Sequence, residues 1–517
     1  MMRAVLLTLV LTMAPLLVAP AMAATHVAPV PTLSAAIQAG EKATAIRLID
    51  RHQGVNTAES DGTTPLHYAA SREDVDLVQR LLRAGANAKA RNQYGSTPLS
   101  EAAASGNAQI IKLLLKAGAN PESPNGEGQT ALMLVARTAN VDAAELLIKA
   151  GANVNAREGW KEQTPLMWAA AQRQPAMVRL LIKAGAEVDT RSRIHDWQRQ
   201  VTAEPRALFR PVGGLTPLLF ATREGCQECV AALLDAHADI NLGDPEETAP
   251  LLVAVLNAHW DLASYLIDRG ADIQKWDYSG RTPLYAAVDM NTIPHGGRAD
   301  GPTLDSTTSF QIIQKLLEKG ANPNAQLKLL PPLRSLIDDR AMDNQLIAGA
   351  TPLLRAAKAF DAPVIELLLK YGAKVDLPNS RGMTPFMVAA GLGSTDADSR
   401  GNYVTTDVQE RSIASLKLLL AAGADINRHD GGRGLTALHE ASRWGWNDVV
   451  KYLVANGADI DAKDRQGMTP IDSALGRAGG NSRFGQRIDV FEKTAQLLRD
   501  LKAAKTAGTA IASTVQP

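Results

Sequence analysis

The only two cysteines of the chain, Cys226 and Cys229, stand three positions apart in the stretch "GCQECV". A Cys-x-x-Cys pair can be a redox centre, half of a zinc site or part of a haem-attachment signal. A haem signal needs a histidine directly after the second cysteine, and Val230 stands there instead. A zinc site needs further ligands that this part of the sequence does not offer. A buried structural role, a local disulfide and a catalytic redox role therefore stay open for the pair.

The other residue types that could do chemistry form no recognisable catalytic pattern. His439 and Glu440 lack the second histidine of a zinc-protease motif, and His195 with Asp196 has no spaced partner. The sequence contains neither a Gly-x-Ser-x-Gly string nor a Walker-type loop. We therefore expect no enzyme activity, no cofactor and no metal site.

The composition narrows the class of protein. The 54 basic and 54 acidic residues balance, whereas nucleic-acid binding favours a strong basic excess. Two cysteines in 517 residues form no disulfide framework. Aromatic residues make up only 4% of the chain, which is typical of many small helices packed through alanine and leucine. A nucleic-acid partner is not expected.

The N-terminus has the order of a secretory signal peptide. Arg3 is followed by an uncharged apolar run over residues 4–18, and Ala21, Met22 and Ala23 form a small-x-small cleavage site. We predict a signal peptide over residues 1–23, with an uncleaved anchor as the alternative. No later segment is apolar enough to span a membrane, so we expect an exported chain, most simply in a bacterial periplasm, without membrane insertion after cleavage.

The elements around the cysteines repeat along the chain. A Gly-x-Thr-Pro-Leu-like string recurs mostly every 33 residues, with occasional larger gaps, which indicates a repeat array. The third position of this string falls at Thr64, Thr97, Thr130, Thr164, Thr216, Ala249, Thr282, Thr351, Thr384, Thr436 and Thr469.

Each unit predicts two helices and a turn. In the unit from Gly95, Thr97 is a suitable N-cap and Pro98 occupies the first helical position. Residues 105–107, "SGN", break the first helix, and the second helix has an apolar stripe that includes Ile110 and Leu114. Gly118 suits the left-handed residue that ends it, and at the same position of the fifth unit we expect a left-handed His237.

This grammar resembles the ankyrin repeat, with its Thr-Pro-Leu-His and Gly-Ala-Asp-x-Asn landmarks; "GTTPLHYAA" at 62–70 and "GLTALHEAS" at 434–442 are the closest matches. The resemblance implies an all-α solenoid of about eleven units with short finger turns, over residues 62–505. Residues 24–61 would then hold a degenerate capping repeat, and residues 506–517 a disordered tail. It also implies a structural hydrogen bond for His67 and His439.

Five insertions interrupt the 33-residue period. Those at 291–309, 393–411 and 476–489 fall between the two helices of a unit. Those at 191–213 and 324–348 fall in the finger turn, and they hold apolar residues such as Ile194, Trp197 and Leu329. Apolar residues in exposed loops usually cover something, so we expect the finger insertions to contact a partner.

The resemblance also implies which positions vary for binding, namely those beside the finger glycine and at the end of the first helix. Aromatic residues and arginine dominate many protein interfaces. We therefore predict a monomeric, non-catalytic scaffold that binds a protein, with a redox protein and a secreted effector as alternatives. Together with Trp197, the predicted contacts are Tyr94, Trp160, Tyr278, Arg281, Arg381, Arg433, Arg443, Trp444 and Arg465.

Overall fold

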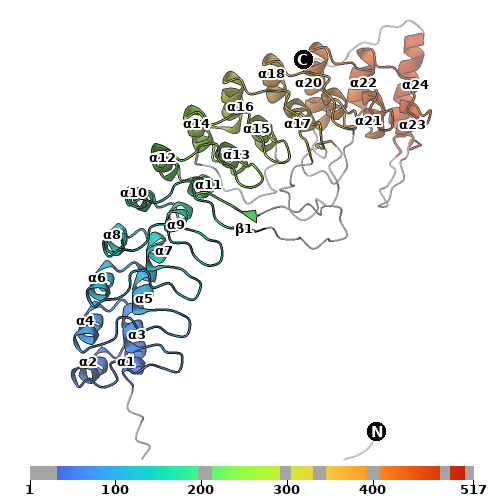
Figure 1. Cartoon of the computed structure of the whole chain (residues 1–517). Helices are drawn as coiled ribbons and strands as arrows, with labels where there is room; N and C mark the ends of the chain where they lie inside the picture. Colours follow the sequence, from blue (N-terminus) through green and yellow to red (C-terminus); the bar gives the residue numbers. More distant parts are fainter. Residues whose placement is uncertain are drawn as a thin grey trace, which may run out of the picture.

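A computed structural model describes residues 32–195, 212–291, 304–329, 345–392, 407–477 and 490–506. These residues form a curved array of stacked helix pairs, which confirms the mostly helical repeat architecture (Figure 1). The predicted signal peptide lies outside the described residues, and so does the predicted tail at 506–517 apart from Thr506, which ends α24.

Each pair consists of a first and a second helix. Among the described residues the first helices are α1 (Leu33–Ala39), α3 (Pro65–Ser71), α5 (Pro98–Ser105), α7 (Ala131–Ala136), α9 (Pro165–Ala171), α11 (Pro217–Arg223), α13 (Pro250–Leu256), α15 (Pro283–Asn291), α17 (Pro352–Lys358), α19 (Pro385–Ala389), α21 (Ala437–Arg443) and α23 (Pro470–Ala474). The second helices are α2 (Lys42–Asp50), α4 (Val75–Arg83), α6 (Ala108–Lys116), α8 (Val141–Lys149), α10 (Pro175–Lys183), α12 (Gln227–Asp235), α14 (Trp260–Asp268), α16 (Ser309–Glu318), α18 (Ala362–Lys370), α20 (Val408–Ala421), α22 (Asn447–Ala455) and α24 (Glu492–Thr506).

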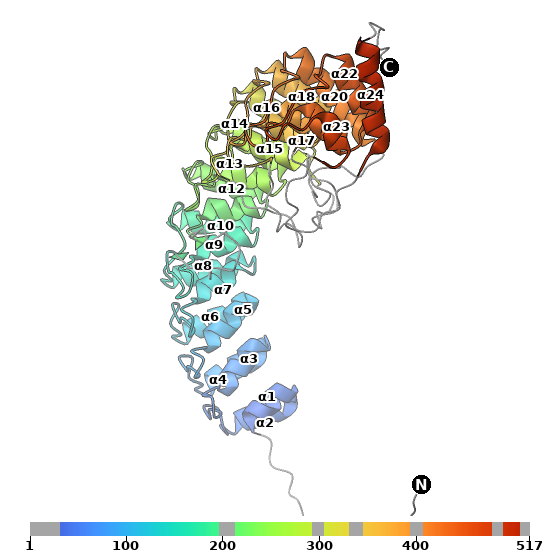
Figure 2. The same ribbon diagram turned by 90° about the vertical axis from the view of Figure 1, so that its right-hand side faces the viewer.

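The two kinds of helix form two layers. In Figure 1 the first helices lie on the inner side of the curve, the second helices lie on the outer side, and the finger turns project inward. Figure 2 shows the same units stacked one on the next along the array. The core lies between the layers; Ala102 and Ala103 of α5 and Ile110 and Leu114 of α6 are fully buried. The small alanines let neighbouring first helices approach closely.

The helix ends form as the sequence pattern of the repeat unit predicts. The Thr97 hydroxyl accepts a hydrogen bond from the Ser100 backbone N–H at 3.1 Å, and Pro98 begins α5. Gly118 follows α6 with φ 84°, and His237 follows α12 with φ 66°, as expected for a left-handed residue. The fifth unit therefore ends its second helix with a left-handed residue, as other units do, although histidine adopts this conformation less easily than glycine.

The insertions fall in the connections between the described helices and interrupt none of them. The gaps between α15 and α16, α19 and α20, and α23 and α24 contain the three interhelical insertions, and the finger insertions separate α10 from α11 and α16 from α17. The first finger insertion begins and ends in a two-stranded antiparallel sheet, in which β1 (Ile194–His195) pairs with β2 (Val212–Gly213). This short sheet is one departure from the all-α prediction.

Candidate functional site: the finger edge

The fingers are rigid turns built around one polar side chain each. In the finger before α5, the Asn92 side-chain oxygen accepts the backbone N–H groups of Tyr94 at 3.1 Å and Ser96 at 2.9 Å. Gly95 between them has φ 75°, which glycine adopts without strain. Asp277 and Asp464 hold later fingers in the same way. Each finger therefore presents its remaining side chains from a fixed backbone.

Backbone hydrogen bonds join successive fingers into a ladder. Each rung connects an N–H of one finger to a carbonyl oxygen of the finger before it, so the tips form a continuous edge along the array. The rungs are Gln93 to Asp61, Gly126 to Tyr94, Gly159 to Glu127, Arg193 to Lys161, Tyr278 to Glu246, Lys328 to Ser279, Ser380 to Ala348, Gly431 to Arg381 and Arg465 to Arg433, at 2.7–3.1 Å.

The ladder is interrupted at the first finger insertion. Pro245 stands four residues before Ala249, at the place that Gln93 and Tyr278 hold relative to their own helix starts, and proline has no N–H to donate. Within the described part of the chain, no rung joins this finger to the preceding one. Gly214, directly after the insertion, lies beside Pro245 instead; a Cβ added to Gly214 would lie 2.6 Å from the Pro245 ring.

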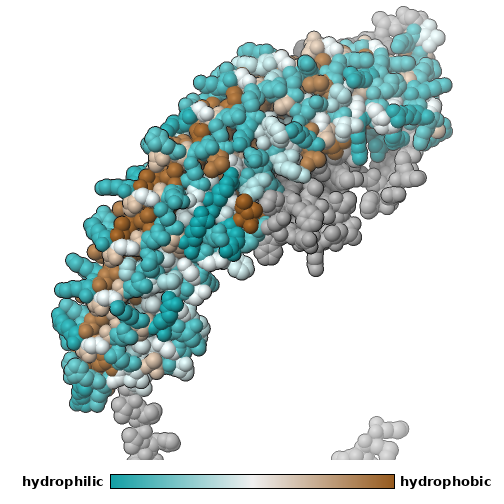
Figure 3. Space-filling model, in the orientation of Figure 1, coloured by the Kyte–Doolittle hydropathy of each residue, from teal (hydrophilic) through white to brown (hydrophobic). Residues whose placement is uncertain are grey.

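Exposed apolar side chains concentrate on the finger edge. Nine large apolar residues are exposed among the described residues, and seven of them lie on fingers or at the bases of the finger insertions. Their exposed fractions run from 65% for Tyr94 down to 39% for Leu329. The seven are Tyr94, Trp160, Ile194, Val212, Trp276, Tyr278 and Leu329. The face drawn in Figure 3 is mixed: hydrophilic residues predominate, and hydrophobic patches also recur along the array.

A groove of about 930 Å³ opens between the third and fourth fingers. Its walls are residues 124–129 and 158–161 with Gln163, and Trp168 of α9 lies at its base. The Arg137 guanidinium lies 5.3 Å from the centre of the Trp168 ring, a cation–π contact. The buried Trp168 indole N–H has no acceptor among the described residues.

The acidic residue in this groove supports the backbone. Glu158 is buried, and its carboxylate accepts the backbone N–H groups of Trp160 at 2.6 Å, Lys161 at 2.7 Å and Gln163 at 3.0 Å. It therefore takes the place of the asparagine in the earlier fingers and holds Trp160 outward. Its hydrogen-bonding capacity is used within the finger, so we assign it no catalytic role.

The first finger insertion lies directly beside this groove. The Arg193 guanidinium pairs with the Glu162 carboxylate at 2.7 Å, and this hydrogen bond holds the Glu162 pKa below its ordinary value. The His195 ring lies 6.4 Å from the Trp160 ring. The insertion thus extends the apolar surface from Trp160 to Ile194 and Val212.

Six of the ten predicted contact residues lie on the finger edge. Tyr94, Trp160 and Tyr278 are exposed, Arg381 and Arg465 are exposed, and Arg433 is half-buried. Trp197 lies outside the described residues.

The remaining three residues differ: the prediction for Arg281 is wrong, whereas Trp444 and Arg443 lie at the end of α21, as predicted. Arg281 is buried and pairs with Asp277 at 2.7 Å inside its own finger, so its guanidinium is not available to a partner. Trp444 is half-buried; its indole N–H donates to the Gly391 carbonyl at 3.2 Å, and its ring stacks on Trp446. Arg443 is exposed at the end of α21, where it was predicted, and it pairs with the buried Glu440 at 2.9 Å.

Trp276, Val212 and Trp168 were not predicted. Trp276 stands two residues before Tyr278 on the same finger, and the Lys328 ammonium lies 3.1 Å from its ring centre. Alternation along the finger could have indicated Trp276. Val212 and Trp168 could not be found in this way, because their positions depend on the pairing of β1 with β2 and on the neighbouring units.

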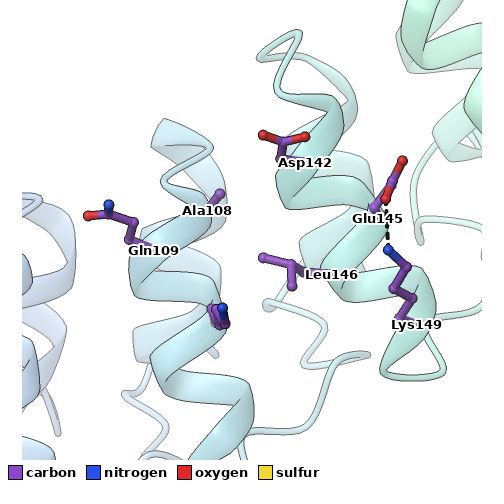
Figure 4. A pocket seen from close by; sticks show the side chains of 7 residues that line it. Ala108, Gln109, Asp142, Glu145, Leu146 and Lys149 are labelled. Atoms are coloured by element: carbon purple, nitrogen blue, oxygen red, sulfur yellow. Dashed lines mark hydrogen bonds and ion pairs between the residues drawn. The ribbon is translucent and has the colours of Figure 1, made fainter.

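A second groove lies between the outer helices α6 and α8 (Figure 4). It measures about 250 Å³ and is lined by Ala108, Gln109, Lys112, Asp142, Glu145, Leu146 and Lys149. The Lys149 ammonium pairs with the Glu145 carboxylate at 2.8 Å, and both groups are well exposed. The groove offers no buried polar group directed at a ligand, so we place no site there.

The cysteine pair forms a disulfide. Cys229 occupies the predicted buried position of α12 and is fully buried, while Cys226 precedes that helix. Their sulfur atoms are bonded, so the pair is not the free structural thiol that its core position favours. In the described residues no cluster of histidine, cysteine and carboxylate side chains could hold a metal ion. Within the same residues, no helix has the length and apolar character needed to cross a bilayer.

Comparison with known proteins agrees with the repeat geometry. A family model for three copies of the ankyrin repeat matches residues 33–125, 118–192, 218–327 and 407–482, and a model for a single repeat matches residues 348–380. The chain is 30% identical over 192 residues to the B-cell lymphoma 3 protein homolog of Mus musculus, covering 36% of this chain and 34% of that protein.

Two further relatives show how local the similarity is. The chain is 34% identical over 175 residues to the nuclear factor NF-kappa-B p105 subunit of Gallus gallus, which covers 33% of this chain and 14% of that protein. It is 32% identical over 277 residues to a putative palmitoyltransferase, ZDHHC13, of Danio rerio, covering 53% and 34% respectively. The chain spans about a third or less of the curated relatives it matches.

Proposed function

Because the chain belongs to the ankyrin repeat family, we propose that it is a non-catalytic scaffold that binds a protein partner along its finger edge. The observation that carries this proposal is the concentration of seven of the nine exposed large apolar residues on the fingers. Aromatic anchors on a rigid backbone are the usual centres of protein interfaces. The ladder of hydrogen bonds holds the fingers in one conformation. Because the fingers are already ordered, binding a partner costs less conformational entropy.

The strongest anchor of the proposed surface is Trp160. It is 63% exposed, it borders the groove above Trp168, and the first finger insertion continues its apolar surface. The exposed Arg381 and Arg465 on later fingers would extend the contact toward acidic groups of the partner. We propose that the chain binds as a monomer.

We also propose that this binding takes place in the cell envelope, most simply in a bacterial periplasm. The support is the N-terminal sequence, with its apolar run over residues 4–18 and the cleavage site at Ala21–Ala23. Fractionation of the source cells with N-terminal sequencing of the mature chain tests this point. Recovery of the protein in the cytoplasm with its first residues intact would refute it.

Quantitative affinity capture tests the binding surface. Partners are captured on the wild-type chain, on Trp160→Ala and Trp276→Ala, and on the control Gln109→Ala, which alters the outer helix α6. Partner recovery should fall at least about tenfold for each tryptophan variant, since anchor residues commonly contribute 2 kcal/mol or more, and should not change for the control. Equal recovery from all four chains, with unchanged circular dichroism, would show that the finger edge is not the binding surface.

A further inference from the structure

The disulfide spans the same three residues as the hydrogen bond that caps the second helix in other units. Asp74, Asn107 and Asn140 stand directly before second helices, and each side-chain oxygen accepts the N–H three residues later at 3.0–3.1 Å. Cys226 holds this capping position before α12, and its sulfur lies 3.3 Å from the Cys229 backbone nitrogen. The same three-residue span is therefore closed here by a covalent bond as well.

The two sulfur-bearing residues differ in their access to solvent. Cys226 retains 6% of its surface, whereas Cys229 is fully buried in the core of the array. The His259 ring packs against the preceding Gly225, with ring atoms 2.8 Å from the ideal Cβ position, so it closes that side of the disulfide. Both residues are buried, and Cys226 is the one of the two that retains some exposed surface.

The helix needs only small changes when the bond is broken. A free Cys226 sulfur would still lie in the capping position, where it can accept the Cys229 N–H in the manner of Asp74 and Asn107. Cys229 would remain a small apolar residue of the core.

We propose that Cys226 and Cys229 form a thiol–disulfide exchange site whose co-reactant is a dithiol, with Cys226 as the sulfur that is attacked. This activity is independent of the finger edge, because the disulfide lies at the start of α12 and no finger residue takes part in it.

The exchange is balanced in electrons and protons. A thiolate of the dithiol attacks the Cys226 sulfur, a mixed disulfide forms, and the Cys229 sulfur leaves and takes up a proton. The second thiol of the co-reactant then attacks its own bonded sulfur and displaces Cys226 as a thiolate. The proton that the second thiol of the co-reactant loses balances the proton taken up at Cys229. The dithiol is oxidised to a disulfide, the protein disulfide is reduced to the Cys229 thiol and the Cys226 thiolate, and the reverse sequence restores the bond.

Native-state reduction of the full chain with dithiothreitol tests the proposal. Samples taken during the titration are alkylated and analysed by mass spectrometry, while circular dichroism follows the fold. Cys226 should become alkylated without loss of helical signal, and it should react on the order of ten times faster than the fully buried Cys229 at pH 7. Reduction only at denaturant concentrations that unfold the array would overturn the proposal and identify a structural crosslink.

Single-cysteine variants provide a second measurement. Cys226 in Cys229→Ser should form a mixed disulfide with a small disulfide reagent, whereas Cys229 in Cys226→Ser should react at least about tenfold more slowly. Equal rates in the two folded variants would refute Cys226 as the attacked sulfur. Partner capture by Cys226→Ser/Cys229→Ser should equal that of the wild type, which separates this site from the proposed binding function.

Discussion

Two buried histidines, His67 and His439, connect their own units to the next unit through contacts of both ring nitrogens. In both His67 and His439 the ring Nδ1 lies 2.8 Å from the threonine hydroxyl that precedes its helix. The Nε2 atoms lie 3.1 Å from the carbonyl oxygens of Ser96 and Met468, which belong to the next finger. The structural hydrogen bond that the family resemblance implied for these residues is thus confirmed. Burial lowers the pKa of both rings below the ordinary value for histidine.

These histidines should make the array sensitive to mild acid. Because their pKa is lowered on folding, their contribution to stability is complete above the unfolded value of about 6.5 and is lost as the pH falls through the folded value. The urea midpoint should therefore fall between pH 7.5 and pH 5.5. The urea midpoint should fall less in His67→Ser/His439→Ser, because this variant lacks the two titrating rings. Serine is chosen because the second unit has Ser100 at this position. An equal fall in the double variant would contradict the assignment.

The left-handed His237 should cost the fifth unit stability. At φ 66° a histidine is strained relative to glycine, so His237→Gly should stabilise α12 by up to about 1 kcal/mol. Native-state hydrogen exchange of α12 measures this locally. Gly151→Ala is the opposite control, because Gly151 has φ 94° with nothing within 4 Å of an added Cβ; it should destabilise α8 by about the same amount. Faster exchange in His237→Gly would show that its ring makes stabilising contacts.

Single residues also mark the limit of prediction from the sequence. His237 could be predicted because the repeat register alone places it after a helix. Arg281 could not be predicted, because its burial depends on the direction of the Asp277 carboxylate inside the folded finger. The partial burial of Trp444 could not be predicted for a similar reason, since it depends on the neighbouring Gly391, which leaves room for its ring.

At the scale of elements, the helices are predictable and the finger ladder is not. Thr97, Pro98 and Gly118 act within one unit, so the local sequence contains their signal. A ladder rung needs two fingers from different units, and only its interruption at Pro245 has a local signal.

The ladder can be tested with glycines at one repeated position. A Cβ on Gly95 would lie 2.6 Å from the Gly126 nitrogen and would break that rung, whereas Gly467 on the last finger has nothing within 4 Å. Both have positive φ, 75° and 80°, so both alanine variants have the same backbone strain. Gly95→Ala should therefore lower the free energy of local unfolding by about 1–2 kcal/mol more than Gly467→Ala. Equal losses would show that the rung adds no stability.

On the scale of the whole molecule, stability should depend on neighbours rather than on one central core. In the interior of the array each helix pair packs against a pair on either side, whereas among the described residues α1 and α2 pack mainly against one neighbouring pair, α3 and α4. Repeat arrays of this kind add their stability unit by unit. The unfolding curve of the full chain should therefore be broader than that of a two-state protein of similar size.

Removal of the first pair tests this additivity. Deletion of residues 32–57 takes away Leu33, Ile37 and Ile49, which are buried at the end of the array. The amide protons of α3 and α4 should then exchange markedly faster, because their outer apolar surface loses its cover, whereas those of α13 and α14 should exchange at the wild-type rate. The full chain measured under the same conditions is the reference. Faster exchange in every helix would instead show that the array unfolds as one cooperative unit, and partner binding at the fingers would then depend on distant ends of the molecule.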